Sequence, residues 1–458
     1  MTDISPAEPD STPATVTVDL AGPAHGGSVL GRLGEDAGDR AGQVVFVRGA
    51  LPGETGARVL LDPGTGKKRY LTGRVEGPDA VAGPSPHRTA PACPAAAAGA
   101  GCCDLDYVDQ EGSAAWKHDV VVDQFTRIGH IDLTAVPVTT RSLRPFTGYR
   151  TRVRLGVDSE GRAGLRISGS HSTVPVERAV CAQWAPGLAD GLAEELGGLT
   201  LTPGAEVCVA VGDDGRRSAV ELTKPAAKRR TTRGRRDRRP SAPHRRIVRR
   251  VLTGPGTVTH TVNAVTWTVP VEAFWQAHLQ APAFYSDWIT ATLSAAAPDV
   301  PEQATAWDLY GGAGVFAAAL TEALPGAQVA CVDVASSATT AGRDALEGRP
   351  VSFIAGDVAA SFGKLDTLTG TEPRNPFAVV LDPPRTGAGR KILTEVTTRA
   401  PEHILHIGCD PATAARDAAD LCAAGYRPES VVVADAFGLT HHVEVLVHYV
   451  RDVAPGDR

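Results

Sequence analysis

The last 200 or so residues alternate between short apolar runs and helix-like tracts, and this alternation constrains the fold more than any other feature. The runs that read as strands are 306–310, 327–334, 351–357, 376–382 and 403–408. Tracts with helical periodicity, such as GVFAAALTEAL, lie between them. Repeated strand–helix units predict a parallel sheet covered by helices, with ligands bound at the carboxyl ends of the strands. Two further runs, 429–437 and 442–450, predict a closing hairpin.

The chain has 458 residues, which is too long for one hydrophobic core, so several domains are expected. The predicted fold class is multidomain α/β, with a Rossmann-like C-terminal sheet, a small N-terminal barrel and a central β-rich domain. Short alternating strands with Gly and Pro between them indicate the barrel, which resembles an oligonucleotide-binding fold. The expected boundaries are a disordered segment 1–14, the barrel 15–78, a central domain with a Cys-rich loop 79–227, an Arg-rich linker 228–250 and a catalytic domain 251–458.

Charge is distributed unevenly along the chain. Residues 228–250 hold 12 Lys and Arg against one Asp, so removing this +11 segment from a net charge of −6 leaves −17 for the other residues. A solvated linker explains such a run, but dense Arg also suits a polyanion, because guanidinium groups pair with phosphates. No apolar run reaches the about 18 residues that span a bilayer, and the acidic N-terminus lacks the pattern of a signal peptide. We therefore expect a cytoplasmic protein that binds no membrane.

A glycine-rich turn follows the first predicted strand in DLYGGAGVFAAAL, residues 308–320. Gly312 lets the backbone approach a ligand closely, and Asp333 ends the next strand, where a nucleotide-binding sheet places the acid that holds a ribose. Neither GxGxxG nor GK[ST] occurs, so a cofactor without phosphates, S-adenosylmethionine, fits better than a dinucleotide. Asp357 in AGDV, after the third strand, resembles the acidic residue that meets adenine in such enzymes.

Cys409 follows a predicted strand directly and precedes an Asp-Pro step and an Ala-rich helical tract, in HIGCDPATAARD. A thiol alone in such a place is more often packed in the core. At a strand end beside a helix start, however, the thiolate form is favoured, and Cys409 becomes a candidate nucleophile. Asp382 ends the fourth strand in LDPPRTGAGR, where two prolines stiffen the turn.

Taken in order, FWQ, DLYGGAG, DPPRTGAG, HIGCDPATAARD and HHVE resemble the motifs of RNA uracil-5-methyltransferases. The segment 31–59 resembles the RNA-binding TRAM barrel of the same family. The resemblance implies a methyltransferase that makes 5-methyluridine in rRNA or tRNA from S-adenosylmethionine. It also implies that Gln276, Tyr310, Asp333 and Asp382 contact the cofactor, that Cys409 is the nucleophile and that Glu444 is the general base.

This chemistry matches what uracil requires. C5 of uracil is a poor nucleophile until a thiolate adds to C6 and makes C5 an enolate carbon, which then attacks the sulfonium methyl group. The C5 proton must afterwards be removed so that the thiol can leave. In a structured RNA the target uridine must first be flipped out of its stack.

Many members of this family hold an iron–sulfur cluster, and the resemblance places its ligands at Cys93, Cys102, Cys103 and Cys181. Four thiols are the number that binds a [4Fe–4S] cluster. Their spacing departs from the family pattern, whose second Cys would fall at Ala100. A loop of partly buried thiols that binds no metal is the alternative.

Two other functions compete with uracil methylation. An RNA cytosine-5-methyltransferase also uses a Cys that adds to C6, although its nucleophile typically follows the fourth strand, where this chain has Asp-Pro-Pro-Arg. A non-catalytic RNA-binding protein would keep the barrel and the Arg-rich segment without needing Cys409, Glu444 and Asp382. We expect RNA as the partner and a monomeric chain.

Overall fold

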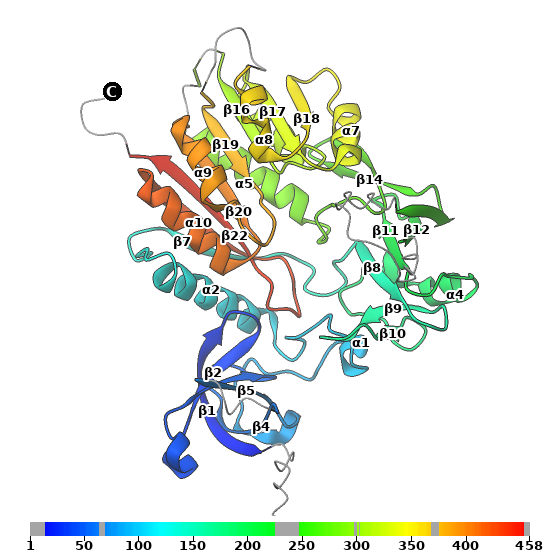
Figure 1. The fold of residues 1–458 in the computed structure, drawn as a ribbon, viewed down its shortest axis with the longest axis vertical. Helices are drawn as coiled ribbons and strands as arrows, with labels where there is room; N and C mark the ends of the chain where they lie inside the picture. Colours follow the sequence, from blue (N-terminus) through cyan, green and yellow to red (C-terminus); the bar gives the residue numbers. More distant parts are fainter. Residues whose placement is uncertain are drawn as a thin grey trace, which may run out of the picture.

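The computed structural model describes residues 14–63, 69–224, 247–296, 300–301, 303–367 and 375–452. The expectations for residues 1–13 and for 228–246, most of the Arg-rich segment, lie outside the described residues. Figure 1 shows a barrel at the bottom, a central β-rich part on the right and a large sheet with its helices at the top.

The N-terminal barrel consists of β1 (Thr15–Ala24), β2 (Ser28–Leu33), β3 (Val44–Arg48), β4 (Thr55–Leu61), β5 (Tyr70–Val75) and β6 (Val81–Gly83), with the short helices η1 (Glu35–Arg40) and η3 (Pro78–Ala80). The strand order is β1-β2-β3-β5-β4-β6, and β1 also pairs with β4, which closes the sheet on itself. Val18 and Leu20 alternate with outward residues and point into the barrel core. The barrel expected from the alternating pattern is therefore present.

The central part is built on a second antiparallel sheet of β8 (Arg152–Val157), β9 (Ala163–Arg166), β10 (Thr173–Pro175), β11 (Glu206–Val211), β12 (Arg217–Thr223) and β13 (Val248–Thr253), with the helices α1 (Pro94–Ala97), α3 (Pro186–Ala189) and α4 (Leu192–Gly197). Its order is β10-β9-β8-β11-β12-β13. The edge strand β13 begins inside the expected linker 228–250, so Arg249 and Arg250 belong to this sheet, which extends to Thr253. A separate hairpin, β14 (Thr257–Val262) and β15 (Val265–Pro270), connects it to the catalytic part.

The large sheet contains β16 (Thr305–Leu309), β17 (Gln328–Asp333), β18 (Val351–Ala355), β19 (Ala378–Leu381), β20 (His403–Gly408), β21 (Tyr426–Asp435), β22 (Glu444–Arg451) and β7 (Val138–Ser142). Its order is β18-β17-β16-β19-β20-β22-β21-β7. The strands β16 to β20 are parallel, and β21 and β22 form the expected antiparallel hairpin. The order reverses between β16 and β19, which is where open α/β sheets bind ligands.

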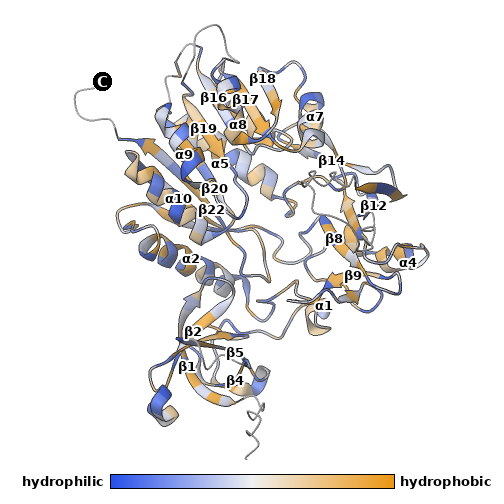
Figure 2. Ribbon diagram, in the orientation of Figure 1, coloured by the Kyte–Doolittle hydropathy of each residue, from blue (hydrophilic) through white to orange (hydrophobic). Residues whose placement is uncertain are grey.

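Helices cover both faces of the large sheet. One face packs against α5 (Ala281–Ala296), α6 (Val315–Ala323) and α7 (Ser336–Ala345), and the other against α2 (Gln110–Arg127), α8 (Val358–Leu365), α9 (Gly389–Thr398) and α10 (Pro411–Ala423). Ala306 and Trp307, neighbours on β16, belong to opposite faces. Because both faces are covered, the strands are hydrophobic along most of their length (Figure 2).

The helix α2 and the strand β7 were expected inside the central domain, and the structure places them against the large sheet. β7 pairs in parallel with β21 at the edge of that sheet. On α2, Trp116 and Val120 belong to the core cluster of the barrel, whereas Val121 and Phe125 belong to the core of the large sheet. One helix therefore fixes the barrel against the catalytic part. Pairing between segments nearly 300 residues apart leaves no local sequence signal.

Within the described residues, no helix is both long enough and apolar enough to cross a membrane.

Two buried histidines face each other between β20 and β22. Nδ1 of His403 lies 3.0 Å from Nε2 of His448. Burial lowers the pKa of both rings, to about 4 for His448, from an ordinary value of 6.5. In the unfolded chain the same rings take up protons near pH 6.5. The free energy of unfolding should therefore fall as the pH falls from about 6.5 to 4.

The substitution His448→Gln keeps a hydrogen-bonding group but removes one titrating ring. We expect the dependence of unfolding free energy on pH to become shallower between pH 6.5 and 4, by at most about 1.4 kcal/mol per pH unit. Thermal and urea unfolding over this pH range measure the slope. His171→Gln, at an exposed position, is the matched control. An unchanged slope in His448→Gln would show that this ring is already charged in the folded protein.

Candidate active site

The carboxyl edge of the large sheet gathers most of the residues that the sequence singles out. Tyr310 and Gly312 follow β16, Asp333 ends β17, Asp357 follows β18, Asp382 follows β19 and Cys409 follows β20. Glu444 begins β22, which runs antiparallel beside β20, so its first residue lies at the same edge. Gln276 lies on the connection between β15 and α5.

Four of the expected cofactor residues line one narrow cavity. Gln276, Tyr310, Gly312 and Asp382 face it together with apolar side chains, among them Phe316. Nε2 of Gln276 donates a hydrogen bond to Oδ2 of Asp382, at 3.3 Å. The cavity is thus apolar with a few polar groups at one end, as is common for sites that bind small organic ligands.

Asp333 and Asp357 are placed differently. Oδ2 of Asp333 accepts a hydrogen bond of 3.1 Å from the backbone N–H of Gly312, which has a φ of +56°. Asp333 therefore shapes the glycine turn that borders the cavity. Oδ1 of Asp357 accepts from the N–H of Ala360 and caps α8. Neither residue is among those that line the cavity.

Acidic groups surround this apolar cavity. Burial, followed by the charges of Asp308 and Asp333, raises the pKa of Asp382 to about 8. Burial also raises the pKa of Asp308, to about 7, and its Oδ1 atom has no hydrogen-bond partner among the described residues. A nearby cation stabilises the ionised form of such acids and so lowers their pKa. S-adenosylmethionine carries a sulfonium and an ammonium group, so the residues present fit this cofactor.

Cys409 lies at the end of β20, directly before α10. Asp410 caps that helix by accepting from the N–H of Thr413 at 2.9 Å. Gly408 lets the backbone pass close to α10, because a Cβ at this position would lie 2.8 Å from Cβ of Ala414. Burial, then the charges of Glu444 and Asp382, raise the pKa of Cys409 to about 12, although Arg385 opposes them. The sequence predicts a position that favours the thiolate; burial and the neighbouring carboxylates, both of which arise only in the fold, make the free protein favour the thiol.

Glu444 is buried at the start of β22, and its Oε2 atom has no hydrogen-bond partner among the described residues. Burial and the nearby Asp382 raise its pKa well above the ordinary value of 4.5. An unpartnered buried carboxyl group is unusual and is typical of sites that bind a ligand or transfer a proton. Cys409, Glu444 and Asp382, from three adjacent strands, therefore form one electrostatically coupled group.

Two further cavities lie on the other side of Cys409. One, of about 220 Å³, is lined by Cys409, Arg385 and His442 and by residues of the barrel and α2. The other is a groove of about 520 Å³ that shares Arg385 and His442 and continues along the central sheet. Arg150, Arg152 and Arg154 line this groove. Nε and Nη2 of Arg152 are buried without partners among the described residues, so the groove is suited to an anionic ligand.

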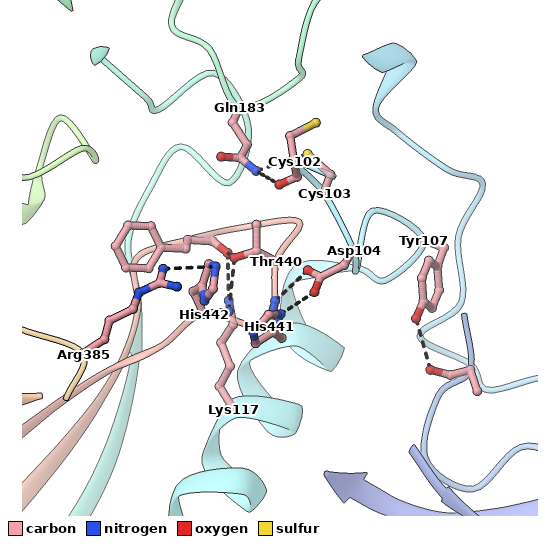
Figure 3. A network of polar contacts seen from close by, with 12 residues as sticks. Cys102, Cys103, Asp104, Tyr107, Lys117, Gln183, Arg385, Thr440, His441 and His442 are labelled. Carbon is pink, nitrogen blue, oxygen red and sulfur yellow. Dashed lines mark hydrogen bonds and ion pairs between the residues drawn. The ribbon is translucent and has the colours of Figure 1, made fainter. Parts of the chain in front are cut away.

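The loop between β21 and β22 is held by contacts with distant parts of the chain (Figure 3). Lys117 on α2, which is fully buried, pairs with Asp435 and donates to the carbonyl of Phe437 at 3.0 Å. Asp104 pairs through Oδ2 with the ring of His441. Its Oδ1 accepts a hydrogen bond of 3.1 Å from the backbone N–H of the same residue. Nη2 of Arg385 lies 3.4 Å from Nε2 of the next residue, His442.

Sequence reasoning missed Lys117, Asp435 and Asp104. Their partners are more than 300 residues away, so no local pattern marks them. His441 stands beside the recognised Glu444 in the HHVE motif and could have been found there.

The cysteines expected to bind iron and sulfur do come together. The sulfurs of Cys93, Cys102, Cys103 and Cys181 all lie within 4.8 Å of one another. Sγ of Cys93 is 3.7 Å from that of Cys102 and 3.9 Å from that of Cys181, which is 3.6 Å from Sγ of Cys103. Nε2 of Gln183 donates to Sγ of Cys103 at 3.2 Å, and two backbone N–H groups point at Sγ of Cys93. Three of the four residues are buried.

Comparisons with known proteins agree on one class. The chain is 41% identical to an uncharacterized RNA methyltransferase from Corynebacterium efficiens, over 99% of this chain and 100% of that protein. It is 29% identical to a 23S rRNA (uracil(1939)-C(5))-methyltransferase RlmD from Halomonas elongata, over 93% and 88% of the two chains. The fold matches that of a Pyrococcus abyssi tRNA (uracil-54, C5)-methyltransferase solved with S-adenosyl-L-homocysteine, with a TM-score of 0.62, 16% identity and coverage of 95% and 100%. No family model matches the chain.

The raised pKa of Cys409 can be tested without any substrate. Iodoacetamide reacts with thiolates, so the rate of Cys409 alkylation as a function of pH, followed by mass spectrometry, reports its pKa. We expect an apparent pKa well above the about 8.5 of a free thiol, and a lower one in Glu444→Gln, which removes a carboxylate that raises it. An apparent pKa below that of a free thiol would contradict this description of the site.

Proposed function

Because this chain belongs to the family of RNA methyltransferases, we propose that it methylates C5 of a uridine in RNA through a covalent bond between Cys409 and C6 of the base. The reaction needs a nucleophile, a base and a methyl donor that meet at one pyrimidine ring. The proposed donor is S-adenosylmethionine, held at the cavity lined by Gln276, Tyr310, Gly312 and Asp382. When bound, it supplies the electrophilic methyl group.

One observation carries the proposal: Cys409, Glu444 and Asp382 converge between the cofactor cavity and the cavity that contains Cys409. Asp382 lines the first cavity and Cys409 the second. The charges of Glu444 and Asp382 both act on Cys409, so the groups are close. A base that entered the second cavity would reach the thiol of Cys409.

Each residue has a defined part in the proposed reaction. The sulfur of Cys409 loses its proton to solvent and bonds to C6, and the electrons of the C5–C6 double bond move toward O4, so that C5 becomes nucleophilic. C5 then accepts the methyl group, whose bond to the sulfonium sulfur breaks and leaves a neutral thioether. Glu444 then removes the proton from C5, the double bond re-forms, and the bond between sulfur and C6 breaks. A raised pKa makes the Glu444 carboxylate a stronger base, although a smaller share of it is ionised at neutral pH.

RNA is the proposed partner, and the structure offers it a continuous basic path. The groove lined by Arg150, Arg152 and Arg154 leads to Arg385 and His442, which also line the cavity of Cys409. Guanidinium groups pair with phosphates, so this path suits a nucleic acid strand. We propose that the barrel is a TRAM domain that adds to this surface and that the substrate is an rRNA or tRNA whose target uridine is flipped out.

An RNA that contains 5-fluorouridine at the target position tests this function. Fluorine at C5 cannot be removed as a proton, so the enzyme should remain bonded to the RNA. We expect a complex that survives denaturing gel electrophoresis and depends on S-adenosylmethionine, with the RNA bonded to Cys409 by mass spectrometry. Cys409→Ser should form none.

Glu444→Gln separates the base from the nucleophile. With ordinary uridine RNA this variant should form the adduct but turn over about 10²–10⁴-fold more slowly, because the C5 proton stays in place. Adducts with 5-fluorocytidine RNA in place of 5-fluorouridine would instead indicate a cytosine methyltransferase. Full methylation by Cys409→Ser would refute the covalent mechanism.

We also propose that Cys93, Cys102, Cys103 and Cys181 bind a metal cofactor. Sulfurs about 2.3 Å from one tetrahedral ion stand about 3.8 Å apart, close to the 3.6–3.9 Å of three of the six sulfur pairs here, and all six pairs lie within 4.8 Å. In the [4Fe–4S] cluster that the family resemblance implies, each thiolate binds a different iron, so the sulfurs must stand roughly 6 Å apart. As they lie, the thiols fit a single ion, and a cluster would require them to separate.

Metal analysis of protein purified without oxygen distinguishes these cases. One zinc or iron per chain without acid-labile sulfide is the expected result, and Cys103→Ser should lose it. Four irons and four sulfides per chain, with broad absorption near 400 nm, would show that the site opens to hold a cluster. A metal-free protein of full stability would contradict the proposal of any metal site.

A further inference from the structure

The turn between β1 and β2 of the N-terminal barrel reaches the active site. Ala24, His25 and Gly26 in this turn line the same cavity as Cys409, Arg385 and His442. A domain expected to bind RNA at a distance thus supplies one wall of the cavity that holds the nucleophile.

The contact between the barrel and the nucleophile segment is direct. Nε2 of His25 lies 2.9 Å from Oδ2 of Asp410, the residue that follows Cys409. The other oxygen of Asp410 caps α10. Burial raises the pKa of Asp410, but the hydrogen bonds from His25 and from the N–H of Thr413 outweigh it and hold the pKa at about 2. Asp410 is therefore ionised and held on both oxygens, so the backbone that carries Cys409 is fixed from two sides.

The next residue of the turn, Gly27, packs against the loop before Glu444. It is buried with a φ of +80°, and a Cβ there would lie 2.8 Å from Oδ2 of Asp104 and 3.1 Å from Nδ1 of His441. Only glycine accommodates both the backbone conformation and this close approach. One short turn of the barrel therefore touches the segments on both sides of the cavity, the one that carries Cys409 and the one that precedes Glu444.

The barrel is held in this position by more than the turn. Trp116 and Val120 of α2 are part of the barrel core, and the same two side chains line the cavity of Cys409. The opposite side of α2 packs on the large sheet. Because the helix belongs to both cores, the barrel cannot move away from the cavity without exposing apolar side chains.

We propose that the turn 24–27 completes the pocket for the flipped target nucleotide and that His25, acting through Asp410, is a positioning residue for Cys409. The inference rests on the proposed function and specifies where its substrate sits. The ligand it assigns to this cavity is a pyrimidine nucleotide, with the base at Cys409 and its phosphate toward Arg385, His442 and His25. The barrel then contributes to the rate of the reaction and not only to RNA affinity.

The test compares two quantities in His25→Ala: the dissociation constant for RNA and the rate of adduct formation at saturating 5-fluorouridine RNA. A positioning role predicts a rate at least about tenfold lower, since small displacements of a reacting group are costly, with an RNA affinity within about threefold of the native value. His25→Gln, which can still donate to Asp410, should recover part of the rate. His171→Ala, in the central part, is the matched control and should behave as the unmodified protein.

A double-mutant cycle isolates the contact itself. Asp410→Asn keeps the helix cap, because Asn caps helices as well as Asp does, but it loses the charge that His25 contacts. If His25 acts through Asp410, adding His25→Ala to Asp410→Asn should slow the reaction no further. Additive losses would assign the two residues separate roles.

The outcomes separate this inference from the proposed function. Native rates in His25→Ala at saturating RNA, or a loss in RNA affinity alone, would reduce the turn to an RNA tether and overturn the inference. Failure of the unmodified protein to form any adduct would instead remove the proposed function on which the inference rests.

Discussion

A thiol and two carboxyl groups share a space at the carboxyl edge of the large sheet in which they cannot all ionise. Cys409, Asp382 and Glu444 stand on adjacent strands, and burial is the largest cause of the raised pKa of each. These three groups tend to stay protonated until a positive charge lies nearby, because a cation stabilises their ionised forms. The cationic methyl donor proposed here brings that charge, and Arg385 already provides part of it for Cys409 and Glu444. The fraction of Cys409 in the reactive thiolate form thus depends on the ligands bound near it.

This arrangement explains why the loop from Asp435 to Glu444 is tied so firmly to distant segments. A buried carboxyl group without a hydrogen-bond partner can accept a proton from a substrate only if the backbone that carries it stays in place. Lys117 fixes the start of the loop through a buried ion pair, and Asp104 fixes its middle through His441. A buried pair adds little net stability but strongly disfavours other arrangements when either partner is lost. These contacts therefore act mainly by holding the loop before Glu444 in one position, and less by raising the stability of the whole protein.

The same contacts join the three parts of the chain at one point. Asp104 follows Cys102 and Cys103 directly, so the loop that carries the thiol cluster also holds His441, while Gly27 of the barrel packs on that pair. The basic groove of the central sheet begins beside these thiols and ends at Arg385. A metal at the cysteines would consequently stabilise both the groove that suits RNA and the loop that leads to Glu444.

Local pattern was sufficient to predict strands β16 to β20 of the large sheet, the closing hairpin and the barrel, because hydrophobic period and glycine placement act over a few residues. The position of Cys409 at a strand end could be predicted for the same reason. The cysteines that gather were identified through the family resemblance. The sequence could not show that β7 joins the large sheet, that α2 serves two cores, or that His25 meets Asp410. Each of these depends on segments hundreds of residues apart, whose contact is decided by how three cores pack together. The ionisation of Cys409 followed from that packing too, since the burial that chiefly raises its pKa, and the carboxylates that add to it, exist only in the folded chain.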